Sequence, residues 1–281
     1  MQRSFLAVAS LAVLLAVTAA SAQTMADAKK RGALRLGYSE TSAPFAFKSK
    51  NDGQPVGYSV ELCKRIASAV SSAGGPSKVE WVSTTPATRL EAVAKGDVDI
   101  ECGTTTITMS RREKVDFSLP IFVDAATILA RKSSATTIAE LQGKKIAVAE
   151  GTTTLDAVEK GLAKRFVKAE VVKTKTVIEA FEMLKDGKVD AMASDRTKLV
   201  GTFLVGGGAE GLIVFSEDLS YEPYGLAVRR NDAEFRLIVD RTLASLYRSG
   251  QIEEIYGQWL APLGKPGIPL LSMYLLNGYP E

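Results

Sequence analysis

Apolar residues recur along this chain with two alternating periods, one typical of strands and one typical of helices. Short apolar runs predict strands, and the stretches between them have the spacing of amphipathic helices, as at 59–72, where Val60, Cys63, Ile66 and Val70 share one face. The first half is expected to hold strands at 33–38, 79–82 and 98–102, with helices at 59–72 and 88–95. This alternation predicts an α/β fold built from βαβ units.

The same order of strands and helices begins again after a bridging segment at about 122–131. Strands are expected at 145–149, 170–173 and 189–193, with helices at 153–165 and 178–186. The segment Leu90–Asp99 also parallels Phe181–Asp190 at an offset of 91 residues, because in both a helix stops at a glycine and a strand begins with Val-Asp. We therefore expect two similar lobes.

The C-terminal part offers too few elements for a third lobe. It contains an expected strand at 225–229 and helices at 233–248 and 252–259, which should pack back on the first lobe. Lobe 1 is then expected to comprise 23–124 and 225–281, and lobe 2 to comprise 125–224. The chain would cross between the lobes near 123–131 and 219–228, which is how a two-strand hinge is made.

The N-terminal segment has the features of a secretory signal peptide. Arg3 precedes an uncharged stretch whose strongly apolar part, 5–17, is short and is followed by the small-x-small pattern Ala20-Ser21-Ala22. Residues 1–22 are therefore predicted to be cleaved on export to the periplasm, the alternative being an uncleaved N-terminal anchor.

Composition narrows the chemistry. Of 281 residues, 46% are hydrophobic and 24% charged, as in a folded soluble protein, and the absence of histidine excludes Ser-His-Asp and Cys-His catalysis and histidine metal sites. Cys63 and Cys102 are too few for a cysteine-based zinc or iron-sulfur site, so a metal would need an all-oxygen site. We expect no metal and no cofactor. After export two thiols tend to pair, and the alternative is two buried free thiols. A net charge of +3 without a basic block argues against a nucleic-acid partner.

Two hydroxyl-rich runs follow expected strands, Gly103–Thr108 in the first lobe and Gly151–Thr154 in the second. The carboxyl ends of strands in open α/β sheets are where ligands bind, and a helix N-terminus favours an anion. Capping-box patterns begin at Ser110, Thr137 and Thr176, and the first predicts that Arg111 lies in the opening turn of a helix.

At these positions the chain resembles the periplasmic amino-acid-binding proteins of ABC transporters, solute-binding family 3. The resemblance covers the mature chain and is closest to the glutamate/aspartate-binding branch. It implies a two-lobed periplasmic binding protein of type II, with no enzymatic activity, that acts as a monomer and delivers an amino acid to an inner-membrane ABC permease. The matching segments are Ser42–Phe45, Gly57–Ser59, Gly96–Asp99, Glu101–Thr106, Arg111 before Val115–Ser118, Gly151–Thr153 and Asp190–Asp195.

The resemblance also implies roles for single residues. Arg111 would bind the ligand's α-carboxylate with help from threonines, and Asp195 would bind the α-ammonium. Arg111 and Asp195 sum to zero charge, whereas adding Arg89 gives +1, which suits a dicarboxylic amino acid. The sequence departs from the acidic-ligand branch at Ser39, where a basic residue is common, and at Val177, so glutamine, asparagine and other polar amino acids remain alternatives. The candidate ligand-binding residues are Arg111, Asp195, Thr104, Thr106, Thr153, Arg89, Thr152 and Ser39.

Two other functions remain open. One is a periplasmic enzyme on the same scaffold, similar to cyclohexadienyl or prephenate dehydratases, for which Glu40 or Glu150 would be the general acid. The other is a subunit that hands its ligand to a sensory receptor. The run Gly206–Gly211 fits G-x-G-x-x-G, but a strand-like segment follows it, so we expect a loop instead of a dinucleotide site.

Overall fold

The computed structural model describes residues 23–206 and 210–280. The predicted signal peptide, residues 1–22, lies outside this part of the chain. Within the described residues, no helix is both long and apolar enough to span a bilayer.

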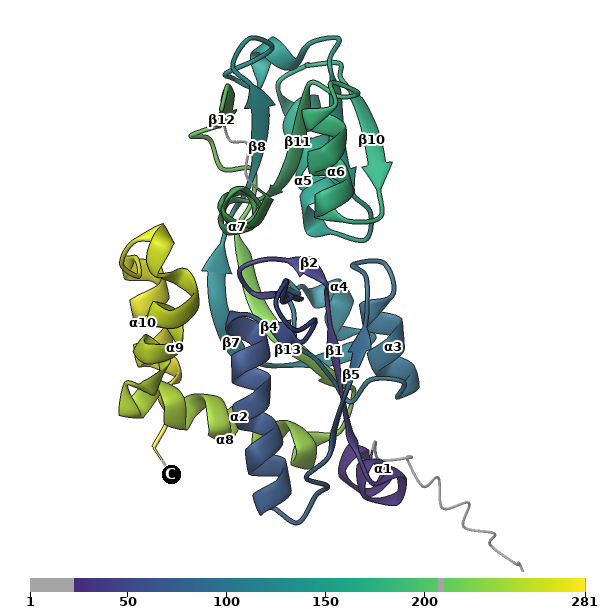
Figure 1. Cartoon of the computed structure of the whole chain (residues 1–281), viewed down its shortest axis with the longest axis vertical. Helices are drawn as coiled ribbons and strands as arrows, with labels where there is room; N and C mark the ends of the chain where they lie inside the picture. The colour runs from purple at the N-terminus through teal and green to yellow at the C-terminus, as the bar shows by residue number, and fades with distance from the viewer. Residues whose placement is uncertain (1–22, 207–209, 281) are drawn as a thin grey trace, which may run out of the picture.

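The chain forms two lobes, each built around its own five-stranded sheet (Figure 1). Lobe 1, the lower one in the figure, has the strand order β5-β1-β6-β13-β7, in which β1 pairs in parallel with β5 and β6, and β13 is antiparallel to β6 and β7. Its strands are β1 (Leu34–Tyr38), β5 (Val79–Ser83), β6 (Ile100–Glu101), β7 (Val115–Asp124) and β13 (Glu222–Arg229).

Lobe 2 repeats this arrangement with the order β10-β9-β11-β8-β12. Strand β9 is parallel to its neighbours β10 and β11, while β8 is antiparallel to β11 and β12. Its strands are β8 (Ala126–Arg131), β9 (Lys145–Ala149), β10 (Glu170–Thr174), β11 (Ala191–Asp195) and β12 (Leu212–Val214). The two-lobed α/β fold expected from the sequence is thus present.

Helices cover both sheets because each presents an apolar face to the strands. In lobe 1, α2 buries Leu62, Cys63, Ile66 and Val70, and it packs against α8 and α9. The lobe 1 helices are α1 (Thr24–Arg31), α2 (Tyr58–Ser72), α3 (Arg89–Lys95), α4 (Met109–Arg112), α8 (Ala233–Ser249), α9 (Gln251–Leu260), η2 (Ala261–Leu263) and α10 (Ile268–Asn277). The lobe 2 helices are η1 (Ala139–Leu141), α5 (Thr153–Lys164), α6 (Val177–Lys185) and α7 (Arg196–Gly206).

Two strands run between the lobes. Strand β7 ends at Asp124 and β8 begins at Ala126, so the chain passes from the first sheet to the second within one residue. The return strand β13 pairs with β7 along its length, with register shifts between Tyr224 and Ala227. The crossing segments therefore lie side by side, as the predicted two-strand hinge requires.

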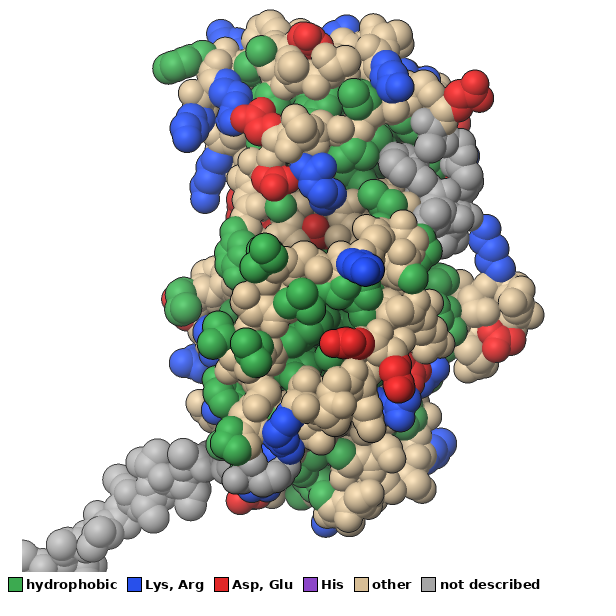
Figure 2. All heavy atoms as spheres, turned by 90° about the vertical axis from the view of Figure 1, so that its left-hand side faces the viewer, with side chains coloured by type: hydrophobic (Ala, Val, Ile, Leu, Met, Phe, Trp, Pro, Cys, Tyr) green, Lys and Arg blue, Asp and Glu red, His purple; other side chains and the backbone are tan. Residues whose placement is uncertain are grey.

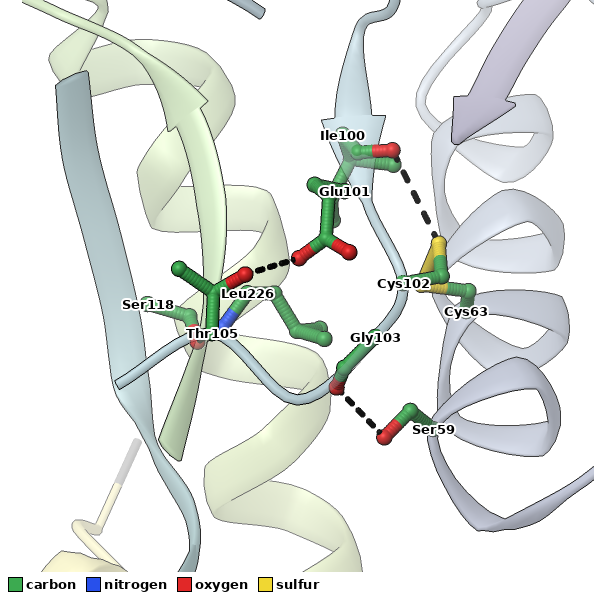
Figure 3. Close-up of a disulfide and its surroundings, with 9 residues drawn as sticks. All are labelled: Ser59, Cys63, Ile100, Glu101, Cys102, Gly103, Thr105, Ser118 and Leu226. Atoms are coloured by element: carbon green, nitrogen blue, oxygen red, sulfur yellow. Dashed lines mark hydrogen bonds between the residues drawn. A yellow bond between two sulfur atoms is a disulfide. The ribbon is translucent and has the colours of Figure 1, made fainter. Parts of the chain in front are cut away.

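A disulfide fastens the loop that follows β6 (Figure 3). Cys63 on α2 is bonded to Cys102, with a Cα–Cα distance of 6.1 Å, which confirms the expected pairing. One residue further on, the Gly103 carbonyl accepts a hydrogen bond of 2.9 Å from the Ser59 hydroxyl, also on α2. This loop is thus tied to the first long helix at two consecutive residues.

Several sequence expectations need correction. The helix at Arg111 begins at Met109 and is capped by Thr108, whose hydroxyl accepts from the Arg111 amide, so the capping box at Ser110 is wrong. The box at Thr137 is also wrong, because Glu140 accepts from Thr136 ahead of a short 3₁₀ turn. At Thr176 the hydroxyl does cap α6 by accepting from Glu179.

Other elements were unforeseen or shifted. The strand expected at 189–193 is β11, Ala191–Asp195, and the one expected at 225–229 begins at Glu222. The G-x-G-x-x-G run falls partly on residues outside the described chain, and strand β12 follows it as expected. The sequence did not predict α1, α10 or a small three-stranded sheet of β2 (Thr41–Ser42), β3 (Ala46–Lys48) and β4 (Pro55–Val56).

Candidate functional site

Arg111 lies where the two lobes meet. Helix α4 presents it after the loop that leaves β6, and its guanidinium donates to the Thr106 carbonyl at 2.8 Å and to the Gly151 carbonyl of lobe 2 at 3.2 Å. Burial, and next the nearby charge of Arg89, lower the pKa of Arg111 to about 10. The guanidinium therefore stays charged at neutral pH while it spans both lobes.

Arg89 is a second buried guanidinium close to the first. It begins α3 with 6% of its surface exposed, and one of its terminal nitrogens donates to the Thr104 carbonyl at 3.2 Å. Its Nε has no hydrogen-bond partner, and the described residues provide no carboxylate in ion-pair contact with it. A buried N–H without an acceptor is costly, so this position is suited to an acceptor that the chain does not supply.

Glu222 joins the hydroxyl-rich runs of both lobes. This buried carboxylate, at the start of β13, accepts from the Thr106 hydroxyl at 2.5 Å and from the Thr153 hydroxyl at 2.6 Å. It also accepts from the Ser220 hydroxyl. Since Thr106 belongs to lobe 1 and Thr153 opens the first helix of lobe 2, one carboxylate on the return strand connects three segments.

Asp195 ends strand β11 and is almost fully buried. Its carboxylate contacts the Lys198 ammonium at 2.6 Å, the Tyr224 hydroxyl at 2.5 Å and the Thr154 hydroxyl at 3.2 Å. Burial acts to raise the pKa of Asp195, but the Lys198 charge and these hydrogen bonds outweigh it and hold the pKa below its ordinary value. Asp195 is therefore a charged group that already has a cation beside it.

A second aspartate lies at the hinge next to this group. Burial, and then the Asp195 charge, raise the pKa of Asp124 to about 7. The Tyr224 hydroxyl lies 3.3 Å from Asp124 and 2.5 Å from Asp195, and its single hydrogen serves the shorter contact. As pH falls through about 7, Asp124 therefore takes up a proton while Asp195 keeps its charge.

The remaining candidates have local partners. Thr104 is buried with its carbonyl on Arg89, and Thr152 caps α5 by accepting from the Leu155 amide at 3.3 Å. The Ser39 hydroxyl accepts from Ser42 at 3.0 Å within the loop after β1. The structure therefore brings five candidates together: hydrogen bonds join Arg89 to Thr104, Arg111 to Thr106 and Thr106 to Thr153, and the charge of Arg89 acts on Arg111. Ser39 and Thr152 make their hydrogen bonds with residues near them in sequence.

The lobes also approach each other closely at Gly151 and at Gly201. A Cβ on Gly151 would lie 2.7 Å from the Ala87 Cα, and a Cβ on Gly201 would lie 2.4 Å from the Ala43 carbonyl oxygen. Beside Thr106, Thr153 and Glu222 there is also a cavity of about 530 Å³, bordered on the lobe 2 side by α5. The arrangement is a pair of lobes closed on a charged interior with an opening along α5.

Lys198, Glu222 and Tyr224 were not identified from the sequence. All three residues are buried. In the sequence, however, Lys198 looks like an ordinary surface residue of a helix, Glu222 like a surface residue before a proline, and Tyr224 like a core residue of a strand. Lys198 joins the site through Asp195, three residues before it, whereas Glu222 and Tyr224 join it through contacts with segments distant in sequence. Glu40 and Glu150, the candidates for a general acid, are both exposed.

Comparison with known proteins gives a consistent result. The model of the bacterial extracellular solute-binding proteins, family 3, matches residues 34–262. The L-glutamate/L-aspartate-binding protein of Pseudomonas aeruginosa is 31% identical over 274 residues, which is 95% of this chain and 91% of that protein. The glutamate/aspartate import solute-binding protein of Escherichia coli is 28% identical, over 85% of this chain and 80% of its own.

A solved structure bears on the enzymatic alternative. The ancestral amino acid-binding protein AncCDT-1, described as a precursor of cyclohexadienyl dehydratase, aligns with a TM-score of 0.72 and 32% identity, over 84% of this chain and 99% of its own. That relative is itself a binding protein.

Proposed function

The chain belongs to the bacterial extracellular solute-binding proteins of family 3, and from this premise we propose that it binds an acidic amino acid, glutamate or aspartate, between its lobes. The observation that carries the proposal is the pair of guanidiniums, Arg89 and Arg111, that lie near each other without a carboxylate in ion-pair contact among the described residues. Guanidinium groups bind carboxylates with paired, charge-assisted hydrogen bonds. Two such groups match a ligand with two carboxylates.

Each end of the ligand has a proposed partner. Arg111 binds the α-carboxylate, because it already donates to carbonyls of both lobes and can complete the closed arrangement. Arg89 binds the side-chain carboxylate through its unpartnered Nε. Asp195 receives the α-ammonium, which must share this carboxylate with Lys198 or displace it.

The proposed biological role is delivery. We propose that residues 1–22 direct export to the periplasm, that the lobes divide at 124/125 and 224/225, and that they close around the ligand about β7 and β13. An inner-membrane ABC permease would then receive the ligand from the closed form, since a ligand shifts this equilibrium by its differential affinity for closed over open. We propose no catalysis, because the exposed Glu40 and Glu150 are poorly placed to donate a proton to a buried ligand.

The test is ligand binding by titration calorimetry on protein that has been unfolded and refolded to remove bound ligand. Arg111→Ala is expected to lower affinity for glutamate at least about 100-fold, since a buried charge-assisted pair is lost. Arg112→Ala is the matched control, because it removes the neighbouring arginine of the same short helix. Loss of less than tenfold in Arg111→Ala, or equal loss in the control, would show that Arg111 is not the anchor.

Specificity is tested at Arg89. Arg89→Gln should weaken glutamate binding at least about 100-fold but glutamine binding less than tenfold, because only glutamate has the second carboxylate. Equal losses for both ligands would remove Arg89 as the specificity residue. If the wild-type protein binds only neutral amino acids, the proposed acidic ligand is wrong and the protein binds a neutral polar amino acid instead.

A further inference from the structure

Lys198 is a buried cation beside the carboxylate that is proposed to receive the ligand's ammonium. It lies in the first turn of α7, its side chain is 6% exposed, and its ammonium nitrogen is 2.6 Å from the Asp195 carboxylate. A lysine is almost never buried to this extent without a paired anion. Asp195 is therefore already paired with an ammonium group that belongs to the chain itself.

The ion pair is closed off from solvent on the hinge side. Figure 2 shows the face of the molecule that carries the hinge and α10, and the surface there is hollowed where the two lobes meet. This hollow, of about 520 Å³, is bordered by Asp124 and Arg196, and neither Lys198 nor Asp195 is among the described residues that line it. Solvent in the hollow therefore does not contact the pair.

A lysine at this place changes which ligands the site rejects. With a lone aspartate, a ligand that has no ammonium would leave a buried carboxylate unpaired, and sites built around such a contact reject the incomplete ligand strongly. Here Lys198 pairs with Asp195 whether or not the ligand has an ammonium. A ligand without an amino group thus leaves Asp195 paired, whereas the ammonium of an amino acid must share or displace the Lys198 contact.

The charges of the site lead to the same class of ligand. Relative to a site with Asp195 alone, Lys198 adds one positive charge, so the matching ligand carries one negative charge more than the amino acid does. Glutamate has a net charge of about −1 at neutral pH. Glutarate has the same two carboxylates but no amino group, so its charge is about −2. Arg89 and Arg111 suit the two carboxylates of either molecule.

We propose that the cleft also binds dicarboxylates that have no amino group, such as glutarate, and that Lys198 is the specificity residue that admits them. The inference rests on the proposed function, because it takes Arg89 and Arg111 as the partners of two carboxylates. It adds a class of ligand beyond the amino acids. In it, Lys198 does for Asp195 what the ligand's ammonium does when glutamate binds.

The first test is titration calorimetry of the wild-type protein, expressed from the full-length sequence, purified after export and refolded to remove bound ligand. L-Glutamate and glutarate are compared at about pH 6, where Asp124 holds its proton and Asp195 is the charged carboxyl beside Lys198. The dissociation constant for glutarate is expected to be no more than about tenfold above that for glutamate. A larger difference would overturn the proposal.

A lysine variant assigns the effect to Lys198. It is made in an Asp124→Asn background, which removes the neighbouring titratable carboxyl, and it is measured at about pH 8, which opposes protonation of Asp195. Lys198→Met should raise the ratio of the glutarate to the glutamate dissociation constant at least about tenfold, since Asp195 then has no cation unless the ligand brings one. Lys185→Met in the same background is the matched control, because it removes a lysine from an exposed ion pair of the same i,i+3 spacing, with Glu182, and should leave the ratio unchanged.

A neutral pair covers the case in which Lys198→Met does not fold. Asp195→Asn combined with Lys198→Met removes both charges, so no buried charge is left unpaired. It should keep glutarate affinity within about tenfold of wild type, while glutamate affinity falls at least about tenfold. A ratio that Lys198→Met leaves unchanged, or loss of glutarate binding in the neutral pair, would overturn the role of Lys198. Wild-type protein that binds glutamate but not glutarate refutes this inference alone, whereas protein that binds neither also refutes the proposed function.

Discussion

Reduction of the Cys63–Cys102 bond is expected to destabilise lobe 1 by about 4 kcal/mol. The two cysteines are 39 residues apart, and opening a loop of this length frees about that much chain entropy in the unfolded state. For a chain of this size the thermal midpoint should fall by about 8 °C or more. Ligand affinity should change less than about threefold, because the Ser59 hydroxyl still holds the Gly103 carbonyl and keeps the loop after β6 in place.

The assay is equilibrium urea unfolding of the wild-type protein with and without a thiol reductant, so that the side chains are identical in both samples. A double variant, Cys63→Ala with Cys102→Ala, should be insensitive to reductant and provides the matched control. A reductant effect below about 1 kcal/mol on the wild type would refute the loop-entropy reasoning. A loss of ligand affinity above tenfold would show that the bond, and not the Ser59 contact, positions the loop.

Three further changes probe the interior of the closed protein. Lys198→Met should lower the ligand-free stability by about 3 to 5 kcal/mol, since Asp195 loses its buried counter-charge, and should enlarge the thermal shift that an amino acid produces. An unchanged shift would argue against contact between Asp195 and the ligand's ammonium. The raised pKa of Asp124, about 7, means that the folded protein holds a proton that the unfolded chain releases near pH 4, so this contribution to stability is present at low pH and is lost as pH rises through 7. Asp124→Asn should remove that part of the pH dependence of the thermal midpoint, and an identical profile would refute it. Gly151→Ala should weaken ligand binding at least about tenfold, because the added Cβ would clash with Ala87 of the other lobe and oppose closure. Ligand-free stability should fall by only about 1 to 2 kcal/mol. Wild-type affinity in this variant would contradict the reasoning.

The alternation of strands and helices could be predicted because each element carries its own period. Helix α2 and strand β9, for example, lie within one residue of the expected bounds. The buried residues of α2 recur with the helical period, and those of β9 form one unbroken apolar run. The proximity of Thr106 and Thr153 was also accessible, because both follow strands that end at the facing edges of the two sheets.

The partners of the charged groups could not be predicted in the same way. Lys198 is buried in an ion pair with Asp195, and Glu222 reaches both threonines only once β13 returns beside β7. Helix α10 was missed for another reason: it is apolar on both faces, so it lacks the one-sided period that marks an amphipathic helix. Contacts between segments distant in sequence leave no local pattern.

The strand order of lobe 1 determines when that lobe can be completed during synthesis. Its sheet needs β13, which lies between β6 and β7, whereas every strand of the lobe 2 sheet falls within residues 126–214. As the chain emerges from its N-terminus, the second sheet is therefore available as a whole while the first still lacks a central strand. The earlier half of lobe 1 must wait, with the edge of β6 that faces β13 unpaired, until residues 222–229, near the beginning of the last quarter of the polypeptide, have been delivered.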